Sequence, residues 1–249
     1  MNPTPSAAPG FRGRLRDRLL GFAHKALPQT CALCAMPCAT SLLCAGCAAA
    51  LPRMGPACPV CALPSTRGEP CGRCLAHLPA YDRTTAAFIY AYPLDQLVQS
   101  YKYRGMLACA GWFAGAMLES RAAPPIADAM VAVPLAKSRQ RERGFNQALE
   151  IAKFLARHTG IPLLAAAVER THDTPPQASL PWRDRAGNVR GAYACAQPDK
   201  ISGRRLLVVD DVMTTGASLE ELAKTLKRAG AVHLENWLIA RTLPPSDPA

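Results

Sequence analysis

The chain has 249 residues, of which 49% are hydrophobic, so it is long enough to bury a core and is neither disordered nor fibrous. Its net charge of +11 is typical of proteins that bind phosphate-rich ligands or nucleic acids. The sequence contains no apolar run of about 18 residues, the length of a transmembrane helix, and no uninterrupted apolar segment typical of a signal peptide. We therefore expect a cytoplasmic protein without a transmembrane segment.

The first 27 residues are predicted to lie outside the folded core. Residues 1–10 contain three prolines and several small residues and cannot bury enough apolar surface to become ordered, so they are predicted to form a tail. Residues 11–27 carry repeated basic residues and are predicted to form a short helix. We interpret this helix as a solvated lead-in to the next module rather than as a binding element.

Eight of the eleven cysteines form four Cys-x-x-Cys pairs, which repeat with a period of 27 residues. The first copy consists of Cys31, Cys34, Cys44 and Cys47, and the second of Cys58, Cys61, Cys71 and Cys74. Two such pairs supply the four thiolates of a closed structural zinc site, so we predict a module at residues 28–78 with two structural zinc ions. The repeat favours sequential pairing within each copy, although interleaved pairing between the copies satisfies the spacing as well.

Disulfides are the alternative interpretation of these cysteines. Four disulfides in a small module are typical of secreted proteins, and the sequence has no signal-peptide pattern, which favours metal ligation. Four thiolates close the zinc shell, so a catalytic zinc with an open position is not expected. The other three cysteines have no partner at metal-ligand spacing and are interpreted as small buried hydrophobic residues: Cys38, Cys109 and Cys195.

Beyond residue 82 the sequence alternates short β-rich runs with helical periods, the pattern of a parallel sheet flanked by helices. We predict strands at 86–92, 130–133, 206–209 and 233–240. We predict helices at 94–101, 112–118, 147–158 and 218–229, the third of which ends at Gly160. The chain is therefore predicted to carry an α/β domain at residues 82–243 behind the cysteine module.

The clearest motif follows the predicted strand 206–209. Two acids, Asp210 and Asp211, come directly after the strand, and a polar loop leads into the next helix. Adjacent carboxylates at the carboxyl end of a parallel strand can accept hydrogen bonds from the vicinal hydroxyls of a ribose. The loop offers hydroxyl and backbone N–H donors to a phosphate at a helix N-terminus: Thr214, Thr215, Gly216, Ala217 and Ser218. An ordinary helix cap is the alternative interpretation, and it requires only a few of these residues.

A second polar cluster follows the predicted strand 130–133. Four cations lie within seven residues of one predicted loop: Lys137, Arg139, Arg141 and Arg143. A loop after a strand of the same sheet is where a pyrophosphate group can be held. A solvated basic loop is the alternative interpretation, which the run of charges by itself leaves open.

The string 206–218 resembles the phosphoribosyl pyrophosphate (PRPP) motif of type I phosphoribosyltransferases at all of its positions. Further runs occur in the order found in the ComF family of competence-associated proteins: KYRG at 102–105, RGFNQ at 143–147, the stretch 170–180, and Arg185 with Asn188. The cysteine-rich front followed by a phosphoribosyltransferase-type domain is similar to the same family. The resemblance extends from Cys31 to Thr242.

This resemblance implies a type I phosphoribosyltransferase fold, a zinc-ribbon module and a role in natural transformation, where imported single-stranded DNA is helped through the inner membrane or onward to recombination. It implies that Asp210 and Asp211 bind the ribose hydroxyls of PRPP and that the loop 214–218 surrounds its 5-phosphate. It places pyrophosphate and a magnesium ion near Lys137, Arg141 and Arg143. Single-stranded DNA and a competence helicase or recombination protein are the implied partners.

The acceptor of a phosphoribosyl group is not indicated. The 6-oxopurine enzymes carry an acid, their proposed general base, where this sequence has Thr214, and no replacement base is evident. Three functions therefore stay open: a phosphoribosyltransferase, that is, a glycosyltransferase acting on PRPP, in nucleotide metabolism; a DNA-handling module with stacking aromatics such as Tyr101, Tyr103 and Phe145; and a PRPP or nucleotide sensor that regulates a partner. ComF-like assistance to DNA uptake is the role we expect.

Overall fold

The computed structural model describes residues 29–38, 41–121, 125–171 and 189–244. The tail and basic helix predicted at 1–27, and most of the stretch 170–180 together with Arg185 and Asn188, lie outside the described residues. The chain separates into two compact units, Met1–Ala50 and Leu51–Ala249. The predicted modules, 28–78 and 82–243, are divided by the cysteine repeat in the sequence, whereas these two units are divided by their contacts in space. The second repeat falls in the second unit because its cysteines pack into the core of the sheet domain.

The described part of the first unit contains the first cysteine repeat. Two short antiparallel strands, β1 (Gln29–Thr30) and β2 (Pro37–Cys38), are followed by the helix α2 (Ala45–Ala49). No residue of α2 is buried. Elements this short cannot bury a core of their own, so the repeat depends on its cysteines for stability.

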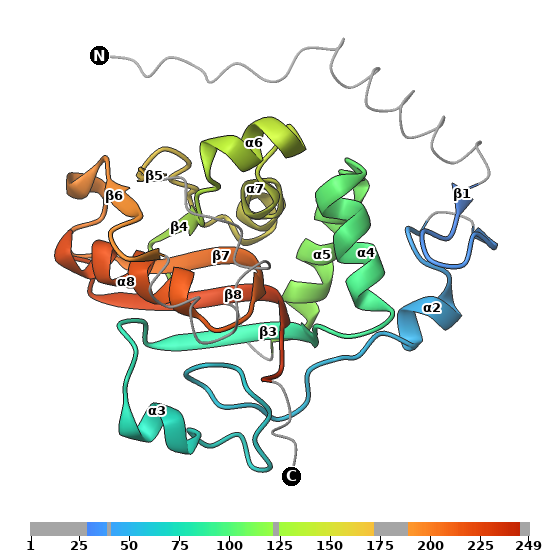
Figure 1. Cartoon of the computed structure of the whole chain (residues 1–249), viewed down its shortest axis with the longest axis horizontal. Helices are drawn as coiled ribbons and strands as arrows, with labels where there is room; N and C mark the ends of the chain where they lie inside the picture. Colours follow the sequence, from blue (N-terminus) through green and yellow to red (C-terminus); the bar gives the residue numbers. More distant parts are fainter. Residues whose placement is uncertain (1–28, 39–40, 122–124, 172–188, 245–249) are drawn as a thin grey trace, which may run out of the picture. The chain divides into compact units, whose positions relative to one another are not determined.

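A four-stranded parallel sheet forms the centre of the second unit (Figure 1). Its strands are β3 (Arg83–Ile89), β4 (Ala129–Ala132), β7 (Arg205–Met213) and β8 (His233–Arg241), in the order β3-β8-β7-β4. The two central strands are buried along most of their length, which is why each contains an unbroken apolar run, 206–209 in β7 and 237–240 in β8. Their register pairs Met213 with Arg241, so the carboxyl ends of β7 and β8 lie side by side.

Helices cover both faces of the sheet. The helix α5 (Ala108–Glu119) packs on β3 and β8, and α7 (Gln147–Thr159) packs on α5, β4 and β7. The helix α8 (Ala217–Arg228) belongs to a core cluster with Leu206 and Val208 of β7. Because side chains alternate along a strand, Leu207 and Val209 point to the opposite face, toward α7.

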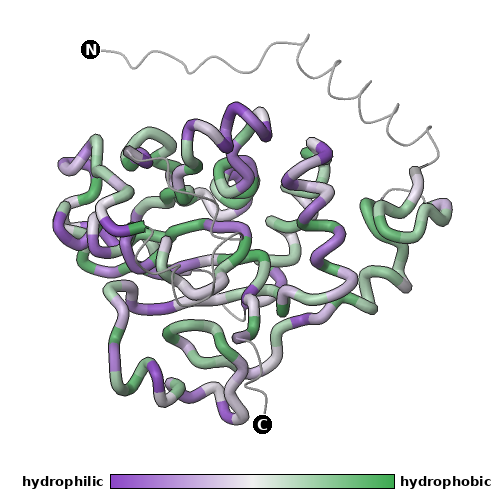
Figure 2. Tube along the Cα trace, in the orientation of Figure 1, coloured by the Kyte–Doolittle hydropathy of each residue, from purple (hydrophilic) through white to green (hydrophobic). Residues whose placement is uncertain are grey.

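The remaining elements lie around the sheet. They are α3 (Gly72–Ala76), α4 (Leu94–Tyr103), α6 (Lys137–Arg143), the antiparallel pair β5 (Val168–Arg170) and β6 (Tyr193–Cys195), and the 3-10 turn η3 (Pro198–Lys200). Figure 2 shows α6 as one of the hydrophilic segments of the chain, and none of its residues is buried. No helix within the described ranges is both long enough and apolar enough to cross a membrane.

The helix α7 begins and ends where the sequence predicts. The side chain of Asn146 accepts a hydrogen bond from the N–H of Leu149 at 3.2 Å, and the helix ends at Gly160, which has a φ of 73°. The stop predicted at Gly160 is therefore confirmed. The amide of Asn146 also donates to the carbonyl of Val133 at 3.0 Å, which fixes the start of α7 beside the end of β4.

The predicted α/β class is confirmed, with the four strands and four longer helices in the predicted order. Three details of the prediction are wrong. The strand predicted at 86–92 is β3 at 83–89, because its pairing with β8 runs from Arg83 to Ile89. The loop predicted around the four cations is the helix α6, because its Lys, Arg, Gln and Glu residues are good helix formers and Gly144, with a φ of 77°, ends it. The strand predicted to end at Val209 continues through both acids to Met213, because its pairing with β8 also continues.

Candidate functional site

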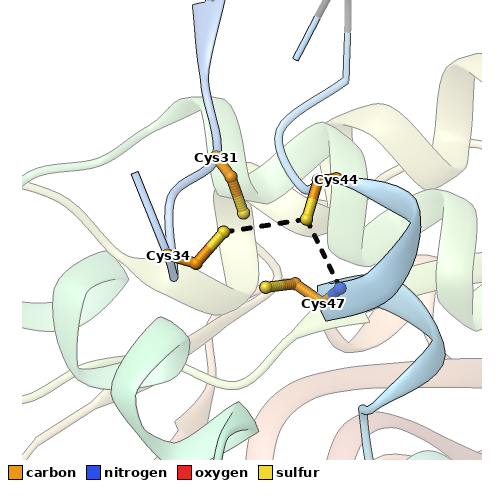
Figure 3. A group of neighbouring side chains, drawn as sticks. All are labelled: Cys31, Cys34, Cys44 and Cys47. Atoms are coloured by element: carbon orange, nitrogen blue, oxygen red, sulfur yellow. Dashed lines mark hydrogen bonds between the residues drawn. The ribbon is translucent and has the colours of Figure 1, made fainter. Parts of the chain in front are cut away.

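The first cysteine repeat gathers four sulfur atoms in one place (Figure 3). The Sγ atoms of Cys31, Cys34, Cys44 and Cys47 all lie within 4.8 Å of one another. Those of Cys34 and Cys44 are 3.7 Å apart, which is close to the edge of a tetrahedron of sulfur atoms around zinc at bond lengths of about 2.3 Å. The first pair of cysteines flanks the turn after β1, and the second pair begins α2.

The second repeat builds the same arrangement inside the second unit. The Sγ atoms of Cys58, Cys61, Cys71 and Cys74 also lie within 4.8 Å of one another. Those of Cys61 and Cys71 are 3.6 Å apart, and three of the four residues are buried. The four-sulfur donor set and the distances in both repeats fit structural zinc. Sequential pairing of the cysteines is therefore confirmed.

Each repeat turns at a residue in the left-handed conformation. Ala35 and Ala62 occupy equivalent positions, with φ values of 59° and 56°, and each donates its N–H to the carbonyl of the first cysteine of its repeat at 2.9 Å. Burial alone would raise the pKa of those first cysteines, but the N–H donors around their sulfur atoms outweigh it and lower the pKa of Cys31 to about 6 and of Cys58 to about 7. The turn therefore favours the thiolate, the form that binds metal.

The disulfide interpretation is wrong, because all eleven cysteines, each of which lies within the described ranges, are free. Cys109 is fully buried in α5, as predicted. Cys38 and Cys195 are only half-buried, which differs from the prediction. Cys38 donates its S–H to the carbonyl of Ser41 at 3.1 Å, so it acts as a polar group of the first repeat rather than as a core residue.

The acids and the polar loop of the second motif lie at the carboxyl end of β7. Asp210 and Asp211 are still part of the strand. The loop residue Gly216 caps α8 with a φ of 88°, a backbone conformation in which any residue with a side chain is strained, so glycine is favoured there. The turn consists of Thr214 and Thr215, and the helix begins with Ala217 and Ser218. The structure thus brings all seven predicted PRPP-motif residues to one edge of the sheet.

Charged neighbours constrain the acid pair. Burial of its carboxyl group and the charge of Asp211 raise the pKa of Asp210 to about 7. The Nζ atom of Lys102 in α4 lies 2.9 Å from Oδ2 of Asp211, and both side chains are less than one fifth exposed. Lys102 and Arg170 partly oppose the shift at Asp210. Two cations from distant segments therefore accompany the two acids.

The helix α6 and the strand β5 bring further guanidinium groups to the same region. Burial, together with the charges of Arg143 and Arg170, lowers the pKa of Arg139, so these three groups are close neighbours. The charge of Arg170 also lowers the pKa of Asp210, so the basic cluster and the acid pair lie within electrostatic range of each other. The predicted pyrophosphate residues differ in their placement, since Arg143 is half-buried whereas Lys137 and Arg141 are exposed.

The side chain of Arg143 is held by two neighbours. It donates to the hydroxyl of Tyr103 and to Oε1 of Gln147, each at 3.2 Å, and its guanidinium lies 5.0 Å from the centre of the Tyr103 ring. The interpretation of Tyr101 as an exposed stacking residue is wrong, because Tyr101 is fully buried and donates to the Gln147 carbonyl at 2.9 Å. Phe145 packs half-buried against it, whereas Tyr103 is 62% exposed.

Reasoning from the sequence missed Lys102 and Arg170 as site residues. Both belong to runs that were quoted for the family resemblance, at 102–105 and 170–180, and that membership is the signal that could have identified them. Their distance along the chain from the acid pair hides the proximity, because Lys102 lies in α4 and Arg170 in β5, two elements outside the strand that carries the acids.

Comparisons with known proteins agree with this organisation. The double zinc ribbon domain matches residues 22–75. Competence protein F of Haemophilus influenzae is 31% identical over 169 residues, which are 65% of this chain and 74% of that protein. The DNA utilization protein YhgH of Salmonella typhi is 34% identical over 226 residues, 87% of this chain and 99% of that protein. Competence protein ComFC of Bacillus subtilis is 28% identical over 114 residues, 45% of this chain and 44% of that protein.

Solved structures of phosphoribosyltransferase type are also similar to this chain. The glutamine PRPP amidotransferase from B. subtilis matches with a TM-score of 0.35 and 24% identity over 52% of this chain and 26% of its own. The purine phosphoribosyltransferase from Pyrococcus horikoshii matches with a TM-score of 0.30 and 18% identity over 57% of this chain and 78% of its own. The chain thus spans a minor part of the first protein and most of the second.

Proposed function

The chain belongs to the family of competence protein F and DNA utilization protein YhgH, and from this premise we propose that it binds PRPP with Mg²⁺ and assists the handling of single-stranded DNA during DNA uptake. The main observation in support of PRPP as the ligand is the acid pair at the carboxyl end of β7, followed directly by a polar loop and the start of α8. The proposed role in DNA uptake is supported by the names of the relatives, competence protein F and DNA utilization protein YhgH.

Each part of PRPP has a chemical counterpart at this edge of the sheet. Asp210 and Asp211 offer carboxylate oxygens to the two ribose hydroxyls. The loop from Thr214 to Gly216 offers N–H donors to the 5-phosphate at the N-terminus of α8, where the helix dipole favours negative charge. The guanidinium cluster of α6 and β5 offers the positive charge that pyrophosphate requires.

Magnesium fits this arrangement by the chemistry of its ligands. The ion prefers oxygen, and in phosphate sites it is commonly bound by one or two carboxylates together with the phosphates of the substrate. Asp210 and Asp211 are the carboxylates present at this edge. When bound with PRPP the ion supplies neutralisation of the pyrophosphate charge, and the contribution of Lys102 is to hold Asp211 in place at 2.9 Å.

Transfer and sensing differ in the step after binding. In a transferase, the guanidinium cluster stabilises the departing pyrophosphate while an acceptor attacks C1 of the ribose. In a sensor, the same groups bind PRPP or a nucleotide without cleavage, and the occupied loop regulates a partner. Release of pyrophosphate from PRPP, measured with and without single-stranded DNA, separates the two, because only a transferase produces it.

Two features of the chain support the proposed DNA-handling role, its net positive charge and its cysteine repeats. The net charge of +11 attracts nucleic-acid phosphates without sequence preference, and such binding weakens steeply with salt. Thiolate ligands need a reducing compartment, so we place the protein in the cytoplasm, where its partners would be imported single-stranded DNA and a competence helicase or recombination protein. The exposed ring of Tyr103 beside Arg143 offers one stacking surface for a base.

Calorimetric titration of the zinc-loaded protein with PRPP and Mg²⁺ tests the ligand. We expect saturable binding of one PRPP per chain, and its loss in the double variant Asp210→Asn with Asp211→Asn, which removes both negative charges but keeps the shape of the site. Zinc content and the unfolding transition serve as controls for the fold. Equal affinity in the wild type and the double variant would exclude the acid pair as the ribose site.

Transformation frequency tests the DNA role. In a naturally competent host whose own family member is deleted, the wild-type chain should restore transformation, and the double variant should not if PRPP binding is part of the role. Restoration by both proteins would separate the DNA role from the PRPP site. Failure of the wild type, with normal protein levels, would argue against assistance to DNA uptake.

A further inference from the structure

A buried arginine links the second cysteine repeat to the loop after β7. Arg241, the last residue of β8, is fully buried, and its Nε donates to the carbonyl of Cys61 at 2.9 Å. Its Nη1 donates to the carbonyl of Met213 at 2.9 Å and also to the carbonyl of Thr214. One guanidinium group therefore joins a cysteine of the predicted zinc site to the first two peptide groups of the predicted phosphate loop.

Further contacts from the second repeat reach the same loop. Nη2 of Arg73, which lies between Cys71 and Cys74 in the sequence, is 3.4 Å from the carbonyl of Thr215 and donates to it. The N–H of Ala80 donates to Oε2 of Glu220 in the first turn of α8 at 2.8 Å. Three segments of the repeat and its connection to β3 thus hold the loop and the helix that follows it.

The direction of these bonds has a consequence for the other side of the loop. In a trans peptide, the C=O of one residue and the N–H of the next point in opposite directions. The carbonyls of Met213, Thr214 and Thr215 point to Arg241 and Arg73, so the N–H groups of residues 214, 215 and 216 point away from them. Within the described residues no group accepts a hydrogen bond from these three N–H groups. Successive N–H groups of this kind form an anion-binding concavity.

We infer that Arg241 is a positioning residue that orients the phosphate loop, and that the second cysteine repeat is a structural part of the phosphate site. The inference rests on the proposed function, because it names what holds the loop ready for a phosphate. It applies to the second repeat alone, since the first belongs to the other compact unit. Without the second zinc ion, the Cys61 carbonyl would no longer hold Arg241 in place. Arg241 would then release the carbonyls of Met213 and Thr214, and the three N–H groups would turn away from the ligand.

Two variants and a matched control test the inference. Arg241→Lys keeps the charge, but its single nitrogen cannot take the places of both Nε and Nη1, so it cannot bridge the Cys61 carbonyl and the loop carbonyls in the same geometry. Arg73→Gln removes the exposed guanidinium. Arg67→Gln is the control, because Arg67 is an exposed arginine of the same repeat without a described contact to the loop. Zinc content and the unfolding transition show whether each variant folds.

The first measurement is hydrogen exchange of the ligand-free protein, which does not depend on PRPP. The N–H of Thr242 donates to the Met213 carbonyl and that of Glu220 to the Gly216 carbonyl, each at 2.9 Å, so both report on the loop. We expect exchange at these two positions to be at least about tenfold faster in Arg241→Lys and unchanged in Arg67→Gln. Unchanged exchange in Arg241→Lys would overturn the inference.

The second measurement is the dissociation constant for PRPP with Mg²⁺. We expect an increase of at least about tenfold for Arg241→Lys, about threefold for Arg73→Gln and none for Arg67→Gln. If Arg241→Lys does not fold, Arg73→Gln decides, and equal affinity in Arg73→Gln and the control would overturn the inference. If the wild type does not bind PRPP, the proposed function fails, and the exchange rates alone decide whether the arginines hold the loop.

Discussion

The two cysteine repeats share their spacing, their left-handed alanine and their four-sulfur geometry, yet they are embedded differently. In the first repeat only Cys31 is buried, and Cys34 is exposed. In the second, Cys58 and Cys61 are fully buried and join a core cluster with residues of β7 and α8. The same metal-binding motif therefore forms a small separate unit in one place and part of a domain core in the other.

The neighbouring residues account for this difference. Met36 follows the first turn and is 62% exposed, whereas its counterpart Leu63 packs against the core cluster. The second repeat also adds to the sheet, since the N–H of Thr84 in β3 donates to the carbonyl of Pro59 at 2.9 Å. A zinc motif thus acquires a role beyond its own stability through the apolar residues and backbone groups that surround it.

The largest expected effect separates the repeats by their contribution to stability. Cys61→Ser should lower the free energy of unfolding of the second unit by more than about 3 kcal/mol, because zinc-binding energy is folding energy for a site within the core. Cys34→Ser, the equivalent change in the first repeat, should alter that energy by less than about 0.5 kcal/mol. Denaturation followed by the fluorescence of Trp112 and Trp237, both in the second unit, measures this.

Zinc content is the control for this pair of variants, since we expect two ions in the wild type, one for each four-sulfur site, and one in each variant. Equal losses of stability in the two variants would remove the distinction between a separate repeat and an integrated one.

A smaller effect per pH unit concerns the second unit, whose stability should fall between about pH 4 and pH 7. The pKa of Asp210 is raised from 3.8 to about 7, so its stabilising contribution is complete below about pH 4 and is lost as the pH rises through 7. Asp210→Asn stays neutral and should be increasingly more stable than the wild type over this range, by up to about 1.4 kcal/mol per pH unit. Denaturant unfolding at pH 5, 6, 7 and 8 measures the difference, and a constant difference would contradict the assignment.

The smallest effect compares the two turns. A non-glycine residue in the left-handed conformation costs about 1 kcal/mol, so Ala35→Gly, at an exposed position, should strengthen zinc retention by up to about fivefold. Ala62 is only 1% exposed, and losing its buried methyl costs a similar amount, so Ala62→Gly should be nearly neutral. Competition with a chromophoric chelator measures both, and a gain at Ala62 equal to that at Ala35 would show that burial does not distinguish the turns.

The sequence predicts those features that depend on residues close together in the chain. The cysteine spacing predicts two four-sulfur sites and favours, without settling, their sequential pairing, and the apolar periods predict the order of strands and helices. The string of acids and small polar residues predicts the loop between β7 and α8. Each of these rests on local spacing, on strand alternation or on helix capping, which a single sequence records directly.

Contacts between distant segments could not be predicted in the same way. Lys102 meets Asp211 because α4 lies near the end of β7, and Arg241 reaches Cys61 across 180 residues of sequence. The grouping of the second repeat with the sheet domain depends on such contacts as well. A charged residue at the end of the apolar run 237–240 is the one local sign that Arg241 binds buried carbonyl groups.

The most direct test of the central claim is hydrogen exchange of the zinc-loaded wild type with and without PRPP and Mg²⁺. The account predicts slower exchange at the end of β7, the loop 214–216 and the first turn of α8, with further slowing in α6, and little change in the first cysteine repeat. Protection confined to other segments, or none at concentrations of PRPP that saturate binding, would contradict the placement of the phosphate site.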